Sequence, residues 1–142
     1  MEKIIYAVAA ETIWTPAMGV VKQVPGRMSA QLGHALSRMR MHRMATYALT
    51  ASNYRDVRKK QLHRFADEAI TTIHLSCRDG KELRHVADLL TKRGVRFWEF
   101  EDSNGEVYGP GQFTTALATI PVRKIQVEGI LDYLPLFAKD LK

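Results

Sequence analysis

The chain has 142 residues, of which 46% are hydrophobic and 25% are charged, and its formal net charge at pH 7 is +6. This size fits one globular domain with its own core and is too small for two, so we expect a single domain over residues 1–142. No apolar run approaches the roughly 20 residues that a membrane-spanning helix requires. The single cysteine, Cys77, excludes an internal disulfide and a cysteine-based zinc site, and it predicts a reducing, cytoplasmic setting.

The positive charge is concentrated in one part of the chain. Between Lys22 and Arg64 there are ten basic residues and one acidic residue, so this segment carries +9 and the rest of the chain −3. Such asymmetry indicates a polyanionic partner, because lysine and arginine neutralise phosphates and release counterions. The alternative is a solvated basic helix face without a ligand. Binding to a membrane surface is disfavoured, because no large apolar face is left opposite the charge.

The first half of the chain predicts one strand and two helical segments. Residues 4–10 are nearly all apolar and predict a buried strand. Residues 11–26 contain two prolines and two glycines, which predict a long loop. A helix is expected over residues 27–49, because its apolar residues recur at helical spacing, and a second, basic helix over residues 54–68.

The second half predicts a strand–helix–strand unit. Strands are expected over residues 69–77 and 95–101, and the helix between them is opened by Asp79-Gly80 and ended by Gly94. Such a unit should be parallel and right-handed.

The last part of the chain completes the predicted sheet. A turn at residues 103–105 is followed by an expected strand at 113–121 and a helical segment at 124–138. The whole pattern predicts an α/β fold, a three-layer α/β/α sandwich with a mixed four-stranded sheet. The strand at 113–121 should run antiparallel to at least one neighbour, because a turn links it to the strand before it.

One face of the predicted first helix carries polar and basic side chains. Their spacing places them within about 80° of one another and away from the apolar stripe; they are Arg27, Gln31, His34, Arg38 and His42. The helix N-terminus after Pro25-Gly26 adds backbone N–H groups and a dipole that favours an anion. The row predicts contact with phosphates, and a solvated polar face is the alternative.

Four carboxylates lie within eight residues around the predicted turn: Glu99, Glu101, Asp102 and Glu106. Clustered carboxylates raise one another's pKa and can supply a general base. A solvated hairpin turn around Asn104-Gly105 explains the same cluster without chemistry. The spacing does not fit a calcium loop, and we expect neither a metal nor a cofactor.

The predicted first helix opens with Gly26-Arg27-Met28-Ser29-Ala30-Gln31-Leu32-Gly33-His34-Ala35, and this segment resembles the signature of the type-2 peptidyl-tRNA hydrolases. A second match lies downstream, in Asp102-Ser103-Asn104, Gly109-Pro110-Gly111 and Thr114, which look like the family's aspartate loop and the start of its last strand. Departures from the family pattern mark a divergent member. Arg27 stands in place of a lysine, Pro25 in place of a second lysine, and Glu106 in place of a threonine.

The resemblance implies hydrolysis of the ester between a peptide and the 3′-terminal ribose of tRNA, by a homodimer. It implies catalytic roles for Asp102, Arg27, Gln31 and Thr114. The resemblance and the concentration of positive charge together predict RNA contacts by Lys22, Arg27, His34, Arg38, Arg58, Lys59 and Lys60. Two alternatives stay open: a catalytically silent RNA-binding relative, and a small-molecule or protein-binding module on the same scaffold.

Overall fold

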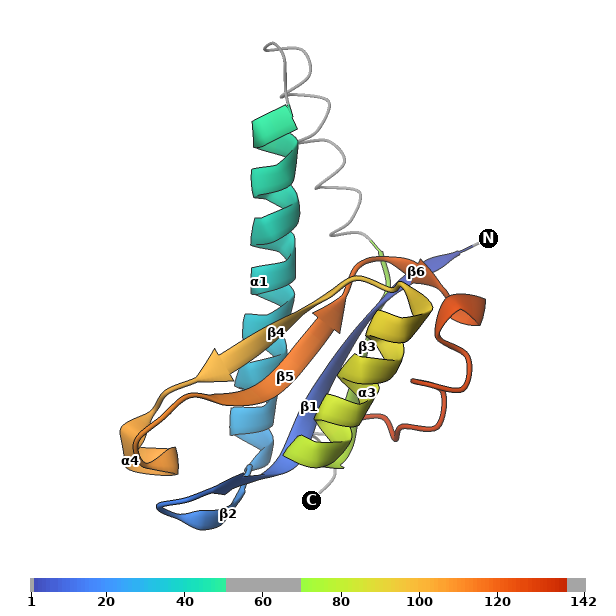
Figure 1. Ribbon diagram of the computed structural model, residues 1–142. Helices are drawn as coiled ribbons and strands as arrows, with labels where there is room; N and C mark the ends of the chain where they lie inside the picture. The colour runs from blue at the N-terminus through green and yellow to red at the C-terminus, as the bar shows by residue number, and fades with distance from the viewer. Residues whose placement is uncertain (1, 51–69, 138–142) are drawn as a thin grey trace.

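The computed structural model describes residues 2–50 and 70–137, the side chains of residues 44–50 excepted. The helix expected at 54–68 lies outside the described residues. The elements, in chain order (Figure 1), are β1 (Lys3–Thr15), β2 (Gly19–Lys22), α1 (Pro25–Thr50), β3 (Thr72–Asp79), α3 (Gly80–Arg93), β4 (Phe97–Asp102), α4 (Gly105–Tyr108), β5 (Phe113–Thr119), β6 (Val122–Arg123) and the 3₁₀ helix η1 (Lys124–Val127).

Strand β1 organises a mixed sheet. It pairs parallel with β3 and antiparallel with β5, which pairs antiparallel with β4. The four predicted strands are therefore all present, in the order β3–β1–β5–β4, and the antiparallel direction of β5 is confirmed. Strands β3 and β4 run parallel but are separated by β1 and β5. Two short strands that the sequence did not predict, β2 and β6, pair with the two ends of β1.

The two long helices cover opposite faces of this sheet. Alternate residues of β1 point to opposite faces, as in any strand. Ile5, Ala7 and Ala9 pack in one core with the apolar side of α1. Tyr6 and Val8 pack in the other core with the apolar side of α3. Because both faces of β1 are buried, its sequence is almost continuously apolar. The α/β prediction is confirmed, with a helix on each face (Figure 1).

Helix α3 begins and ends where its sequence predicts. The carboxylate of Asp79 accepts a hydrogen bond from the Glu82 N–H at 2.9 Å, which satisfies one of the free donors of the first turn. Gly94 ends the helix in the left-handed conformation (φ 76°), which L side chains rarely adopt.

The long loop predicted at residues 11–26 is wrong, because most of it is a β-hairpin. Strand β1 continues to Thr15 and pairs with β2, with Thr15 opposite Gly19. Gly19 has a positive φ of 67°, and the Thr15 hydroxyl accepts a hydrogen bond from the Met18 N–H at 3.0 Å. Of the residues that suggest a loop, Pro16 and Gly19 thus form the tight turn of the hairpin, and Pro25 and Gly26 begin α1.

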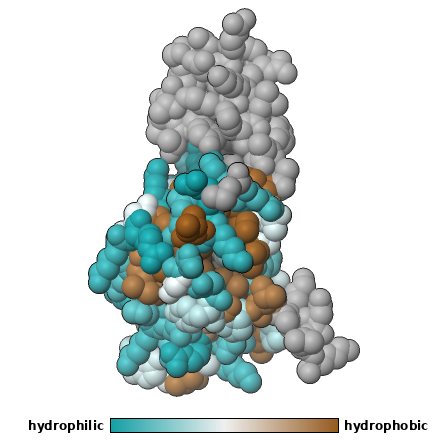
Figure 2. All heavy atoms as spheres, turned by 90° about the vertical axis from the view of Figure 1, so that its right-hand side faces the viewer, coloured by the Kyte–Doolittle hydropathy of each residue, from teal (hydrophilic) through white to brown (hydrophobic). Residues whose placement is uncertain are grey.

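The helix predicted at residues 124–138 is also wrong beyond its first turn. Among the described residues 124–137, only η1 is helical, and Gly129 with a φ of 80° departs from helical geometry. The chain then runs along the free edge of β3, where Ser76 N–H donates to the Pro135 carbonyl and Phe137 N–H to the His74 carbonyl. Figure 2 shows the side of the molecule that carries this segment, where hydrophobic patches are separated by hydrophilic side chains. None of the described helices is long and apolar enough to cross a membrane.

Candidate active site

Several chain segments meet at one edge of the sheet. Strands β1, β3 and β4 end there, and helices α1 and α3 begin there, beside the β1–β2 hairpin and α4 (lower part of Figure 1). In open α/β sheets, ligands bind outside the carboxyl ends of the strands. This edge is therefore where a functional site is expected.

A buried polar cluster lies at this edge, with Gln31 at its centre. Gln31 is only 3% exposed, and its Nε2 donates to Asp102 Oδ2 at 2.7 Å. The same Nε2 lies 3.5 Å from the hydroxyl oxygen of Tyr108, which also accepts from Gln23 Nε2 at 2.7 Å. Tyr108 and Gln23 are buried as well. Side chains from α1, from the segment before it, from the end of β4 and from α4 thus form one hydrogen-bonded group.

The side chain of Arg27 adds a positive charge to this cluster. It is half-buried, and its guanidinium donates to Gln23 Oε1 at 3.5 Å. Arg27 lies in the first turn of α1, which begins at Pro25 and has no acidic residue. The N–H groups of a first helical turn have no partner inside the helix and carry partial positive charge. The entrance to the site therefore has positive potential.

One hydrogen-bonding atom of Gln31 has no partner among the described residues. Its Oε1 is buried and has no partner among the described residues, while its Nε2 is held by Asp102 and Tyr108. Leaving a buried acceptor unsatisfied costs about 1–3 kcal/mol, so such atoms usually bind water or a ligand. The amide is thus fixed with a buried oxygen that has no hydrogen-bond donor among the described residues.

The environment of Tyr108 keeps its hydroxyl protonated. Burial raises the pKa of this hydroxyl above its usual value, and the hydrogen bond from Gln23 opposes that rise. The negative charge of Asp102 raises the same pKa further, whereas the charge of Arg27 lowers it. Tyr108 is therefore a neutral acceptor for the two glutamines at physiological pH.

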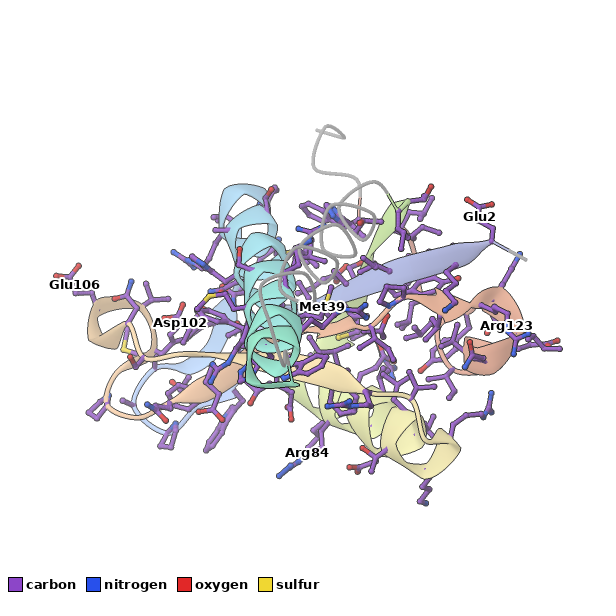
Figure 3. The ribbon with its side chains drawn as sticks, turned by 90° about the horizontal axis from the view of Figure 1, so that it is seen from above. Glu2, Met39, Arg84, Asp102, Glu106 and Arg123 are labelled. Carbon is purple, nitrogen blue, oxygen red and sulfur yellow. The ribbon has the colours of Figure 1, made fainter. Side chains whose placement is uncertain are left out.

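The loop after β4 fixes the Asp102 carboxylate from its other side. The backbone N–H of Asn104 donates to Asp102 Oδ1 at 3.0 Å, and the Asn104 side chain caps α4 by accepting from the Glu106 N–H. With Gln31 on Oδ2, both oxygens of Asp102 are held. Glu106 is exposed and projects from the outer side of α4, away from Asp102 (Figure 3). Of the four carboxylates that lie close together in the sequence, Asp102 is therefore the one that forms a hydrogen bond with Gln31.

The turn of the β1–β2 hairpin packs against this loop at Gly109. Gly109 has a φ of 77°, and a Cβ atom there would lie 2.5 Å from the Cβ of Ala17. Only glycine fits both this backbone conformation and this close approach.

The row of polar residues on α1 continues along the neighbouring strand β4. The ring of His34 stacks on Phe100 at 4.7 Å between centroids, and His42 stacks on Trp98 at 5.6 Å. The guanidinium of Arg96 lies 5.5 Å from the centre of the Trp98 ring. Exposed imidazole and guanidinium groups therefore lie against the half-buried rings of β4 along the α1–β4 side of the site.

Comparison with known proteins assigns the family. The family model described as Peptidyl-tRNA hydrolase PTH2 matches residues 20–137, more than four fifths of the chain. The chain belongs to the peptidyl-tRNA hydrolase PTH2 family. The resemblance found in the sequence is confirmed. A comparison with curated proteins found no match.

The region matched by the PTH2 family contains the whole polar cluster but not the first arm of the hairpin. Gln23, Gln31, Asp102 and Tyr108 lie within residues 20–137, whereas β1 precedes them. The family assignment therefore applies to the cluster itself, and the β1 arm of the hairpin, including Trp14, lies outside it.

The structure brings together some of the residues predicted for the site. Gln31 and Asp102 are in direct contact, and Arg27 joins them through Gln23 and Tyr108. Thr114 is separate, because an irregularity between Phe100 and Glu101 shifts the register of β4 against β5 and pairs Thr114 with Glu101. It lines a neighbouring cavity instead.

The remaining predicted residues concern RNA and metal binding. Lys22, His34 and Arg38 are exposed, on β2 and α1, whereas Arg58, Lys59 and Lys60 lie outside the described residues. Within the described ranges, no group of three or more His, Cys, Asp or Glu side chains is arranged to hold a metal ion. Cys77 is buried, and burial raises the pKa of its thiol to about 12, as suits a small buried apolar residue.

Sequence reasoning does not find two members of the cluster, Gln23 and Tyr108. Gln23 lies in a segment whose prolines and glycines predict a loop, and Tyr108 directly precedes the Gly109-Pro110-Gly111 match without being part of it. A buried tyrosine needs a hydrogen-bond partner for its hydroxyl, and that requirement is the one signal that points to a polar contact.

Proposed function

We propose that this protein hydrolyses peptidyl-tRNA and that the cluster of Gln31, Asp102 and Tyr108 is its active site. The observation that carries the proposal is the buried amide of Gln31, held by Asp102 and Tyr108 with its oxygen unpartnered among the described residues. Membership in the PTH2 family supplies the substrate class.

The chemistry needs a water molecule with a proton acceptor beside it. A water bound in the site donates one hydrogen to Gln31 Oε1 and the other to the carboxylate of Asp102. As the water oxygen attacks the ester carbonyl carbon, Asp102 takes its proton, acting as a general base. The bond between the carbonyl carbon and the ribose oxygen then breaks, and the ribose oxygen receives the proton from Asp102. The products are a free peptide carboxyl group and a tRNA with a free terminal hydroxyl.

Positive potential stabilises the negative charge that develops on the carbonyl oxygen of the ester during the reaction. Arg27 and the first turn of α1 lie at the entrance to the cluster and favour an anion there. The same groups suit the phosphate of the terminal nucleotide. Tyr108 and Gln23 act as positioning residues, because they hold Gln31 and Arg27 rather than the substrate.

The α1–β4 side supports binding of the RNA part of the substrate. The basic side chain of Arg38 is exposed on α1, which contains four arginines and no acidic residue. Phosphate contacts by such residues bind RNA without regard to its sequence. The exposed His34 ring, backed by Phe100, adds a surface on which a base can stack.

The experiment that tests the proposal is incubation of the purified protein with peptidyl-tRNA, with release of the peptide measured beside the affinity for uncharged tRNA. Cleavage together with salt-dependent binding supports the proposal. Binding without cleavage would identify a catalytically silent relative. If the protein neither cleaves peptidyl-tRNA nor binds tRNA, the proposal is overturned, and a module that binds another ligand becomes the better interpretation.

A further inference from the structure

A cavity of about 760 Å³ lies beside the polar cluster, between the β1–β2 hairpin and the start of α3. Its apolar lining comes from Ile13, Trp14, Val20, Leu83 and Phe113. This volume is within the range of roughly 300–1,000 Å³ that is usual for ligand pockets. A second cavity, of about 730 Å³, lies at the opposite end of β1 near Glu2 and Arg123, away from Asp102 (Figure 3).

The first cavity borders the polar cluster. Phe113 lines the cavity, and its ring lies 5.8 Å from the ring of Tyr108, between centroids. Phe113 is also the cross-strand partner of Asp102, and the neighbouring Thr114 is the partner of Glu101. One pair of aromatic rings therefore lies between the cavity and the residues that would cleave the ester.

The charges in the cavity do not suit a polyanion. Lys81 and Arg84 are balanced by Asp79 and Glu99, so the charged lining has no net charge. On the α1 side, by contrast, the helix has only basic charges. The basic residues on the α1 side stabilise a chain of phosphates more strongly than the cavity does, whereas an uncharged chain with apolar side groups fits the cavity.

The rim of the cavity exposes large apolar side chains. Trp14 and Val20 face each other across the hairpin and are 65% and 69% exposed. Met18, in the turn between them, is 54% exposed. Adjacent exposed apolar side chains of this size mark binding surfaces more often than chance. The contact of Gly109 with Ala17 holds the hairpin beside the loop of Asp102.

We propose that this cavity receives the peptide part of peptidyl-tRNA, and that Trp14 and Val20 favour a large apolar side chain on the amino acid at the ester. The inference rests on the proposed hydrolysis of peptidyl-tRNA. With RNA on the α1–β4 side and the ester at Gln31 and Asp102, the peptide extends past Phe113 into the cavity. Trp14 and Met18 precede the segment matched by the PTH2 family, which begins at Val20, so the match does not include this part of the rim.

The test measures binding of non-cleavable conjugates to the full chain. Each probe is a tRNA that carries an N-acetylated amino acid on its terminal ribose through an amide in place of the ester. Wild-type protein should bind the acetyl-phenylalanine conjugate about tenfold more tightly than the acetyl-glycine conjugate, because the phenyl group is buried only in the first. Trp14→Ala should reduce this ratio to about twofold and leave the Kd for uncharged tRNA unchanged.

Ile125→Ala is the matched control, because Ile125 is a similarly exposed apolar residue near the other cavity. It should keep the tenfold ratio. Equal binding of the two conjugates by the wild type would overturn the proposal. An equal loss of uncharged tRNA binding in Trp14→Ala would also overturn it, because the terminal nucleotide would then be the group that Trp14 contacts. If the wild type cleaves no peptidyl-tRNA ester, the hydrolase proposal fails, while the ratio of the two affinities still tests whether the cavity binds the peptide part.

Discussion

Gln31 holds the site together at the scale of single residues. Its amide fixes the Asp102 carboxylate at 2.7 Å and leaves its own oxygen for water. Gln31→Ala should lower the cleavage rate by about 10²-fold, the scale of removing one positioning or stabilising group, with little change in the Kd for tRNA. Gln112→Ala, which removes an exposed glutamine from the same region, is the control and should cleave at the wild-type rate. A Gln31→Ala variant with normal turnover would mean that another group holds the water.

Cys77 should make the stability of the protein sensitive to alkaline pH. Burial raises the pKa of its thiol from 9.0 to about 12, so the unfolded chain loses this proton first as the pH rises. The free energy of unfolding should therefore fall between pH 9 and 12, by up to about 1.4 kcal/mol per pH unit from this group. Cys77→Ala should flatten the decline, measured by urea unfolding from about pH 8 to 11. An unchanged slope would show that the thiolate is tolerated in the fold.

At the scale of elements, the contact between the hairpin turn and Gly109 holds the loop that follows Asp102 in place. Gly109→Ala would place a Cβ 2.5 Å from Ala17 and force an L residue into a left-handed conformation. We expect a loss of about 1–2 kcal/mol in the free energy of unfolding and slower cleavage, because the loop of Asp102 must move. Gly105→Ala is the matched control, since nothing lies within 4 Å of its Cβ position. Equal thermal stability of the two variants would show that the hairpin does not brace the loop.

The elements that the sequence predicts are those with a local pattern. Helix α3 has caps at Asp79 and Gly94, and the apolar runs of β1 and β5 mark strands that are buried on both faces. The last segment depends on backbone pairing with a distant part of the chain, which no local pattern reveals, whereas the hairpin pairs residues that are close in sequence, such as Thr15 and Gly19. Ser76, for example, donates to the carbonyl of Pro135.

The residues of the site likewise divide into those with a recognisable sequence motif and those that only the fold brings together. Gln31 and Asp102 can be predicted to lie together because each belongs to a motif of the family. The contact between Gln23 and Tyr108 joins positions 85 residues apart, and neither residue is itself part of a matched motif. A regular register would place Thr114 beside Asp102, and the irregularity in β4 and β5 moves it to the cavity instead.

At the scale of the whole molecule, the two surfaces that flank the cluster differ in charge. Removing positive charge from the α1 side in the double variant Arg27→Ala, Arg38→Ala should weaken tRNA binding regardless of sequence. The slope of log affinity against log salt should decrease by about 0.7–0.9 for each phosphate that the protein no longer neutralises. The double variant Lys92→Ala, Lys124→Ala removes the same charge from exposed positions outside α1 and should keep the wild-type slope. Equal slopes for all three proteins would contradict the placement of RNA on α1.

The central claim is that Asp102, held by Gln31 and the Asn104 N–H, is the base that activates water. The most direct test is the single-turnover rate of peptidyl-tRNA cleavage by Asp102→Asn at saturating protein, compared with the wild type. Glu101→Gln is the control, because Glu101 is the adjacent, exposed carboxylate of the same strand. The account predicts that Asp102→Asn lowers the rate by about 10²-fold or more with an unchanged Kd for tRNA, while Glu101→Gln stays within about threefold of the wild type. An Asp102→Asn variant that cleaves as fast as the wild type would contradict it.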